Sequence, residues 1–278
     1  MPIAGATRIV PMIGSPIAQV RSPILFNRIF SGDGADARAV VPLEVQPNHL
    51  DAFFALLRGA GNCDGVILTI PHKEPAFELV DSMSERARAL EAVNVVRREP
   101  DGRLVGDMVD GVGFWAAADE AGFCPAGKTL VLAGAGAAGT AIALAFAQGG
   151  GRAVRILDSE PRRIDRLAEK LAGSGCAVEA LSDARWAEVE AVVNATPVGM
   201  AYRPGSLFSD DQLACLPADG MVGDAITEPA ETALLRAARA RGLAAVDGHA
   251  MAAGQFRAMY AFLYPGEAAP ALAGEAVG

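Results

Sequence analysis

The sequence has few charged residues and contains no basic run. Charged residues make up 21% of the 278 positions, and the formal net charge is −9. A chain with this charge balance does not attract nucleic acid or an anionic membrane surface, so we expect neither as a partner. No apolar run approaches the roughly 20 residues of a membrane helix. The first residues also lack a charged region followed by an apolar one, so we expect no signal peptide and a cytoplasmic protein.

Cysteine and histidine are also scarce. The four cysteines include no Cys-x-x-Cys pair, and the three histidines (His49, His72 and His249) are scattered. Zinc sites and disulfide frameworks need cysteines or histidines at close, regular spacings. We therefore expect no bound metal and reduced cysteines.

Apolar residues are abundant at 51%, and they occur in short runs that alternate with helical patterns. In the first third of the chain we expect strands at 7–14, 37–45 and 63–70 and helices at 22–30 and 49–61. A second unit begins near Asp110 and repeats the alternation, with strands expected within 128–133, 153–160, 189–200 and 220–226. This order predicts an α/β fold with a largely parallel sheet.

The sharpest motif is a glycine-rich turn between an apolar strand and an alanine-rich helix. It reads GAGAAG and comprises Gly134, Ala135, Gly136, Ala137, Ala138 and Gly139. The first glycine of such a motif allows a tight turn, the second lets the backbone approach a pyrophosphate, and the third lets helix and strand pack closely. The helix N-terminus favours the anion. The motif predicts a dinucleotide site.

The next strand ends at Asp158, 19 residues after Gly139. A carboxylate at that position accepts hydrogen bonds from ribose hydroxyls and repels a 2′-phosphate, so we expect NAD in preference to NADP. Arg162 and Arg163 follow closely and oppose this preference, because either guanidinium could meet a phosphate.

Seven blocks in order resemble the shikimate dehydrogenase and quinate dehydrogenase family over nearly the whole chain. They are IGSPIAQVRSP (13–23), TIPHK (69–73), EAVNVV (91–96), GDMVDGVGF (106–114), GAGAAG (134–139), NATPVGM (194–200) and DGHAMAAGQ (247–255). The resemblance implies two domains with the active site in the cleft between them. A discontinuous substrate domain would comprise 1–109 and 249–278, and a Rossmann-like nucleotide domain would comprise 110–248. The protein would be a monomer or a homodimer.

The resemblance also implies roles for individual residues. Lys73 would transfer the proton of the reacting hydroxyl, with Asp110 as its partner; a lysine partly removed from water can act in this way. Without the resemblance, Lys73 would be interpreted as a solvated strand end and Asp110 as a helix N-cap. By the same resemblance, the substrate would be bound by Ser22, Thr69, Asn94 and Gln255, and the cofactor by Ser159, Arg163, Thr196, Pro197, Ala225 and Gly248 in addition to the glycine turn and Asp158.

Five expected polar positions depart from the family pattern. Val20 replaces a serine, Ile67 an asparagine, Thr227 a tyrosine, and Met108-Val109 an Asn-Thr pair. Each lost hydrogen bond to a buried substrate group costs on the order of 1–3 kcal/mol. The positions Val20, Ile67 and Thr227 would still adjoin the substrate, a small cyclic hydroxy acid.

Three hypotheses follow. The first is an NAD-dependent alcohol dehydrogenase that acts on shikimate, quinate or a less polar relative. The second is a regulatory protein that keeps the fold and the NAD site without turnover. The third is an enzyme for a modified substrate, for example an aminated ring.

Overall fold

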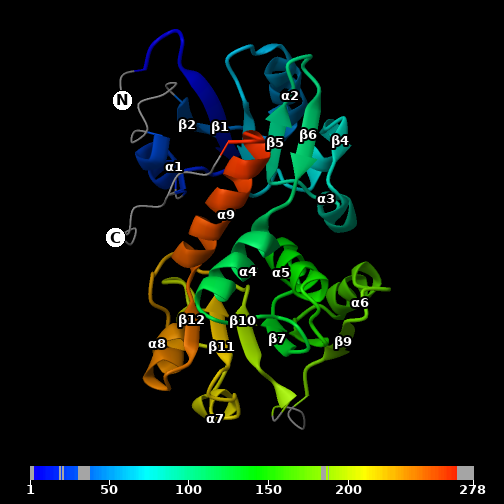
Figure 1. Ribbon diagram of the computed structural model, residues 1–278, viewed down its shortest axis with the longest axis vertical. Coiled ribbons are helices and arrows are strands. Elements are labelled where there is room, and N and C mark those ends of the chain that lie inside the picture. The colour runs from blue at the N-terminus through cyan, green and yellow to red at the C-terminus, as the bar shows by residue number, and fades with distance from the viewer. Residues whose placement is uncertain are drawn as a thin grey trace. The chain divides into compact units, whose positions relative to one another are not determined.

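The computed structural model describes residues 3–18, 20, 22–30, 38–182, 186 and 188–267. The chain divides into two compact units, Met1–Val109 with Phe256–Gly278 and Asp110–Gln255. Each unit is built on a six-stranded sheet, so the predicted α/β class is confirmed (Figure 1). The domain bounds expected from the sequence remain a prediction. Residues 268–278, at the end of the expected substrate domain, lie outside the described residues.

The sheet of the first unit has the strand order β2-β1-β3-β5-β6-β4. Its strands are β1 (Arg8–Gly14), β2 (Arg38–Glu44), β3 (Gly65–Leu68), β4 (Ser82–Met83), β5 (Val95–Arg98) and β6 (Leu104–Asp107). Its helices are α1 (Ser22–Phe30), η1 (Pro47–His49), α2 (Leu50–Gly59), η2 (Pro75–Leu79) and α3 (Glu85–Leu90), and α9 (Gly248–Leu263) ends in this unit. The parallel β2-β1-β3 portion agrees with the predicted alternation.

The hairpin β5–β6 departs from that prediction, because β5 is antiparallel to both of its neighbours, β3 and β6. A tight turn joins them, in which Gly102 has φ +87° and the Glu99 N–H donates to the Arg103 carbonyl at 2.8 Å. The left-handed conformation favours glycine, so the DG pair directs the chain back on itself. The hairpin follows β3 in the sheet and brings Asn94 and Asp107 together, as described below.

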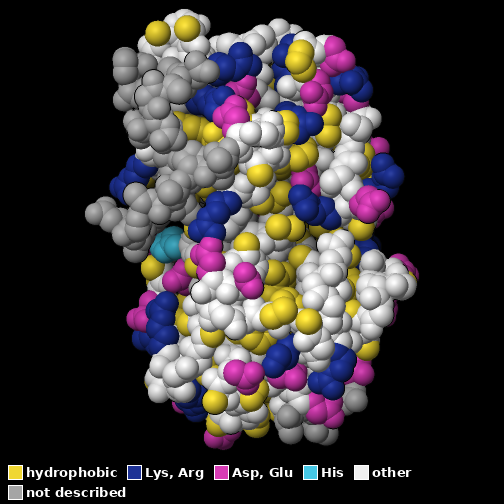
Figure 2. All heavy atoms as spheres, in the orientation of Figure 1, with side chains coloured by type: hydrophobic (Ala, Val, Ile, Leu, Met, Phe, Trp, Pro, Cys, Tyr) yellow, Lys and Arg dark blue, Asp and Glu magenta, His cyan; other side chains and the backbone are white. Residues whose placement is uncertain are grey.

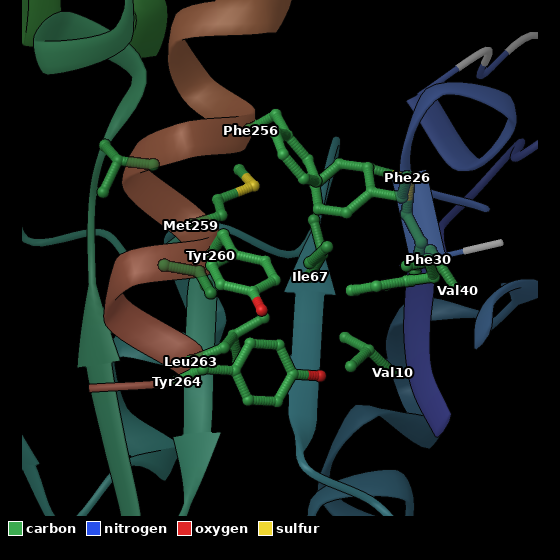
Figure 3. Close-up of a cluster of buried hydrophobic side chains, with 13 residues drawn as sticks. Val10, Phe26, Phe30, Val40, Ile67, Phe256, Met259, Tyr260, Leu263 and Tyr264 are labelled. Atoms are coloured by element: carbon green, nitrogen blue, oxygen red, sulfur yellow. The ribbon is translucent and has the colours of Figure 1, made fainter. Parts of the chain in front are cut away.

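The second half of α9 packs in the core of the first unit (Figure 3). Phe256 meets Phe26 of α1 edge-on with ring centroids 4.6 Å apart. Further along, the Tyr264 hydroxyl donates to Asp64 at 2.9 Å. This core is referred to below as the apolar cluster, and its buried members are Val10, Met12, Phe26, Phe30, Val40, Ile67, Val95, Val109, Phe256, Met259, Tyr260, Leu263 and Tyr264.

All strands of the second unit are parallel, in the order β12-β11-β10-β7-β8-β9. They are β7 (Thr129–Ala133), β8 (Ala153–Leu157), β9 (Ala177–Ala180), β10 (Ala191–Asn194), β11 (Met221–Asp224) and β12 (Ala244–Val246). The helices are α4 (Asp110–Glu120), α5 (Ala137–Gln148), α6 (Pro161–Lys170), α7 (Asp210–Leu213), α8 (Ala233–Ala240) and the first half of α9. The central strands are buried throughout, as expected of a parallel sheet covered on both faces.

Small residues let α4 pack closely on its neighbours in the second unit. A Cβ added to Gly111 would lie 2.0 Å from the Ala141 carbonyl oxygen of α5, and one added to Gly254 of α9 would lie 2.1 Å from the Gly113 carbonyl oxygen. Contacts this short exclude any side chain. The glycines of the DGVG segment therefore fix α4 between α5 and α9, and Asp110 stands at the start of that fixed helix.

Charged side chains of both signs lie at the surface. Figure 2 shows Lys and Arg side chains interspersed with Asp and Glu side chains over the face in view. None of the helices in the described ranges has the length and apolarity to cross a membrane. Within those same ranges, no three His, Cys, Asp or Glu side chains are grouped so that they could hold a metal ion.

Candidate functional site

The glycine turn of the second unit has the geometry that its motif predicts. Gly134 follows β7 with φ +90°, a conformation that glycine adopts without strain. A Cβ on Gly139 would lie 1.9 Å from the Gly134 carbonyl oxygen, so the third glycine lets α5 start close against the turn. A Cβ on Gly136 would meet nothing within 4 Å. The open direction at Gly136 is the one from which a diphosphate would approach the backbone.

The start of α5 suits an anion. Gly136 is its N-cap and supplies no side-chain hydrogen bond to the first amide groups. The first turn contains no acidic residue that would repel an anion from within the helix. The turn and this helix end together fit the diphosphate of a dinucleotide.

Asp158 follows β8, the strand beside β7. Its carboxylate accepts hydrogen bonds from the Ala135 N–H at 2.7 Å and from the Glu160 N–H at 2.8 Å. The side chain is only 3% exposed. Asp158 thus clamps the glycine turn to the end of β8, a role that the sequence did not indicate.

A basic side chain lies beside this acidic segment. The Arg163 guanidinium is 3.8 Å from the Asp158 carboxylate and 3.0 Å from that of Glu160. Ser159, between the two acids, is exposed. Arg163 therefore forms ion pairs with two carboxylates at the place where the adenosine ribose is expected.

In the first unit, backbone hydrogen bonds hold the TIPHK segment at the end of β3. The Thr69 N–H donates to the Ile13 carbonyl at 2.9 Å, and the Val93 N–H donates to the Lys73 carbonyl at 2.9 Å. Thr69 and Lys73 are half-buried. The main chain of the segment is thus held at both ends, while the residue Lys73 keeps partial access to solvent.

His72 is a structural member of this segment that the sequence did not single out. Its ring is fully buried, and Nε2 lies 2.7 Å from the Val45 carbonyl oxygen. A carbonyl only accepts, so Nε2 carries the proton. The imidazole therefore ties the segment to the end of β2.

Asn94 lies between the ends of β3 and β6. Its carbonyl accepts from the Leu68 N–H at 2.8 Å, and its N–H donates to the Asp107 carbonyl at 2.9 Å. The side-chain oxygen accepts from the Val109 N–H at 3.0 Å. Asn94, 1% exposed, thus has a structural task in addition to the substrate contact that the resemblance implies.

Asp107 is a second structural residue that sequence reasoning missed. Its carboxylate is buried, pairs with the Arg86 guanidinium and accepts from the Met108 N–H at 2.7 Å. An acidic residue at the end of an apolar strand was the available signal. The pair fixes the chain just before Asp110.

Three of the five departures from the family pattern join the apolar cluster. Ile67 and Val109 are fully buried within it, and Val20 packs against it half-exposed (Figure 3 labels Ile67). Met108 is also buried, at 2% exposure. Ser22, the first residue of α1, is half-buried. The side chains at these departures are packed as core residues.

Asp110 and Gln255 are hydrogen-bonded to each other in the second unit. The Gln255 amide donates to the Asp110 carboxylate at 2.8 Å, and Asp110 is 2% exposed. Two residues that the resemblance assigns to catalysis and substrate binding are thus adjacent, although 145 positions separate them in the chain.

The remaining predicted cofactor residues follow strands of the same sheet. Thr196 lies against the glycine turn, because a Cβ on Gly134 would be 2.8 Å from its methyl carbon. Pro197 and Thr227 are exposed, and Ala225 directly follows β11. Gly248 starts α9, and a Cβ added to it would lie 2.3 Å from the Ile226 carbonyl oxygen.

The predicted site residues are divided between the two units. The first unit contains Ser22, Thr69, Lys73 and Asn94, whereas the second contains Thr227 and the predicted cofactor residues.

Known proteins resemble the chain along its length. A family model described as the shikimate dehydrogenase substrate binding domain matches residues 12–96. A protein of Rubrobacter xylanophilus named shikimate dehydrogenase (NADP(+)) is 41% identical over 254 residues, which cover 90% of this chain and 88% of that protein. A protein of the same name from Methylobacterium radiotolerans is 38% identical, with coverage of 86% and 85%.

Solved structures share the fold. Shikimate 5-dehydrogenase from Listeria monocytogenes, in complex with shikimate and NAD, superposes with a TM-score of 0.88 at 28% identity over 97% of this chain and 96% of that one. Quinate dehydrogenase from Corynebacterium glutamicum, in complex with NAD, gives 0.84 at 28% identity over 96% of each chain. The predicted substrate-domain and Rossmann-like architecture is confirmed by these matches. The chain belongs to the shikimate dehydrogenase family of nicotinamide-dependent oxidoreductases.

Proposed function

We propose that this chain is an NAD-preferring dehydrogenase for a cyclic hydroxy acid of the shikimate and quinate type. The observation that carries the proposal is the glycine turn, in which Gly136 faces open space beside an uncapped helix start. A backbone arranged in this way receives a diphosphate. The named substrates of the relatives supply the substrate class.

The cofactor would lie on the second unit. The turn 134–139 would hold the diphosphate. Asp158 would face the adenosine ribose, because a carboxylate that accepts two backbone hydrogen bonds can still accept others from ribose hydroxyls. When bound, the nicotinamide ring accepts or returns the hydride. The preference for NAD rests on Asp158 and Glu160, whose charges oppose a 2′-phosphate. The curated relatives are named for NADP(+), so the preference separates this chain from them.

Lys73 would transfer the proton of the reacting hydroxyl. Lys73 is half-buried. A lysine placed beside the substrate can accept the hydroxyl proton in one direction and protonate the ketone in the reverse direction. Asp110, held by Gln255, would be its partner and would orient the ammonium group. Ser22, Thr69 and Asn94 would bind other polar groups of the substrate.

The substrate would be less polar than shikimate. The packing of Ile67, Val109 and Val20 in or against the apolar cluster supports this, because side chains that pack with Phe26 and Phe256 offer no hydrogen bond to a hydroxyl or carboxylate. Several absent hydrogen bonds together lower kcat/KM for a polyhydroxy acid by factors on the order of hundreds. An aminated or otherwise modified ring is a member of the same substrate class.

The test is a panel of cyclic hydroxy acids with NAD+ and with NADP+, followed by absorbance of the reduced nicotinamide. The panel includes shikimate, quinate, deoxygenated relatives and amino-substituted relatives. We expect turnover with at least one member, a larger kcat/KM with NAD+ than with NADP+, and a larger kcat/KM with a less polar member than with shikimate. A folded protein that turns over no member would contradict the proposal.

The alternative is a family member that binds NAD without catalysis, and the apolar replacements favour it. Tight NAD binding with no turnover across the panel is the outcome that it predicts. The retention of Lys73, Asp110 and Gln255 favours the enzyme, because a protein without turnover does not need all three.

A further inference from the structure

The second unit buries a carboxylate that none of the roles above uses. Asp224, the last residue of β11, is fully buried. Its oxygens accept from the Asn194 amide at 3.1 Å, the Ile226 N–H at 3.1 Å and the Thr232 hydroxyl at 2.7 Å. A buried carboxylate is costly unless it is hydrogen-bonded, so these contacts account for its place in the core. Burial raises the pKa of Asp224, and the three hydrogen bonds oppose that rise.

The hydrogen bonds continue from Asp224 into a neighbouring loop. Asn194 ends β10, and its side-chain oxygen accepts from the Thr196 N–H at 3.0 Å and from the Thr196 hydroxyl at 2.7 Å. Its amide also donates to the Val198 carbonyl at 2.9 Å. On the other side, Thr232 is the N-cap of α8. The network therefore ties the loop after β10 to the loop after β11.

The strand order places these loops relative to a bound dinucleotide. The glycine turn follows β7, the clamp at Asp158 follows β8, and β10 and β11 lie on the other side of β7. A dinucleotide spans the carboxyl ends of the strands across the point where the order reverses. With the adenosine ribose at the β8 side, the nicotinamide half falls over β10 and β11, about 5–10 Å from β7 at the usual strand spacing.

The loops have little room to adjust on either side. Thr196 touches the glycine turn, and Gly248 approaches the Ile226 carbonyl so closely that it has no space for a side chain. In the register of the two strands, Asn194 lies opposite Asp224. A change in the hydrogen bonds of Asp224 is thus passed to the backbone of both loops.

We propose that Asp224, with Asn194 and Thr232, is a positioning residue for the nicotinamide half of the cofactor. It holds the loops at 195–198 and 225–231 in the one arrangement that receives the ring, and it does not touch the cofactor itself. This inference rests on the proposed function.

The experiment compares the dissociation constants of NAD+ and of ADP-ribose by isothermal titration calorimetry. ADP-ribose keeps the adenosine and the diphosphate but lacks the nicotinamide ring. We expect Asp224→Asn to weaken NAD+ binding about tenfold or more while ADP-ribose binding changes less than about threefold. Thr232→Val is expected to act in the same direction. Thr232→Ser keeps the hydroxyl group and is expected to leave the ratio of the two dissociation constants at its wild-type value.

A matched control comes from the opposite end of the strands of the same sheet. Thr129 starts β7, is fully buried and accepts a hydrogen bond from Arg152 at 2.7 Å. Thr129→Val removes a buried hydroxyl as Thr232→Val does, but at the amino ends of the strands. We expect it to leave the ratio of the two dissociation constants unchanged.

Equal weakening of both ligands, or no weakening of either, would overturn the positioning role while leaving the proposed function intact. If the wild type binds neither ligand, both fail. If Asp224→Asn does not fold, the comparison of Thr232→Val with Thr129→Val decides, since each loses only one hydroxyl group.

Discussion

Replacing Ile67 by asparagine tests whether the departures from the family pattern are core residues. Ile67 is fully buried in the apolar cluster, where its neighbours are aliphatic and aromatic. The substitution loses about 2 kcal/mol of apolar burial and leaves an amide unpaired at a further cost of about 1–3 kcal/mol. We expect a loss of about 3–5 kcal/mol of stability and no gain in shikimate turnover.

The assay is thermal unfolding by circular dichroism, with hydrogen exchange of the β1 and β3 amides to isolate the first unit. At about 2–4 °C per kcal/mol, the midpoint should fall by about 6–20 °C. Ile67→Val is the control and should cost only about 0.5–1.5 kcal/mol. An unchanged midpoint together with faster shikimate turnover would refute the reasoning, because it would show that position 67 can present an amide to the substrate at no cost to the apolar cluster.

Three further predictions concern the second unit. Gly139→Ala should lower both the midpoint of thermal unfolding and the affinity for NAD+, because its Cβ would stand 1.9 Å from a backbone oxygen. Gly136→Ala should lower only the affinity for NAD+, because its Cβ would meet nothing within 4 Å. Equal effects of the two substitutions on the midpoint would be inconsistent with this geometry. Burial raises the pKa of Cys176 to about 11, so in a native-state thiol titration near neutral pH it should react far more slowly than the two exposed cysteines, and equal rates would contradict its burial. Glu160→Gln should release Arg163 and raise the ratio of kcat/KM with NADP+ to kcat/KM with NAD+ about fivefold or more. This gain should vanish when Arg163→Gln is added. A gain that survives in the double variant would exclude Arg163 as the phosphate contact.

Local signals predicted the geometry of the glycine turn correctly. Three glycines at fixed spacing between a strand and a helix specify a backbone geometry that depends on few distant residues. The position of Gly139 against the Gly134 carbonyl is such a local contact.

The structural carboxylates were not predictable in the same way. Asp107 and Asp224 end short apolar strands, where a sequence shows only an acidic residue before a loop. Their partners Arg86 and Thr232 lie 21 and 8 positions away, and only the folded chain brings them together. The β5–β6 hairpin was missed for a related reason, since its strands of four residues each are too short to show a clear alternation.

The sequence pattern could not predict that α9 belongs to two units. The helix runs without interruption from Gly248 to Leu263, yet Gln255 belongs to one unit and Phe256 to the other. A helical pattern reports which residues share a face, but it does not report which core that face enters.

The most direct test of the central claim is the rate of nicotinamide reduction by Lys73→Ala with the best substrate of the panel. We predict that kcat falls by about 10²–10⁴-fold, as expected when a group that transfers a proton is removed. We also predict that the dissociation constant of NAD+ stays within about threefold of the wild-type value, because the glycine turn lies in the other unit. An unchanged kcat in a folded variant would remove Lys73 from the chemistry and contradict the account.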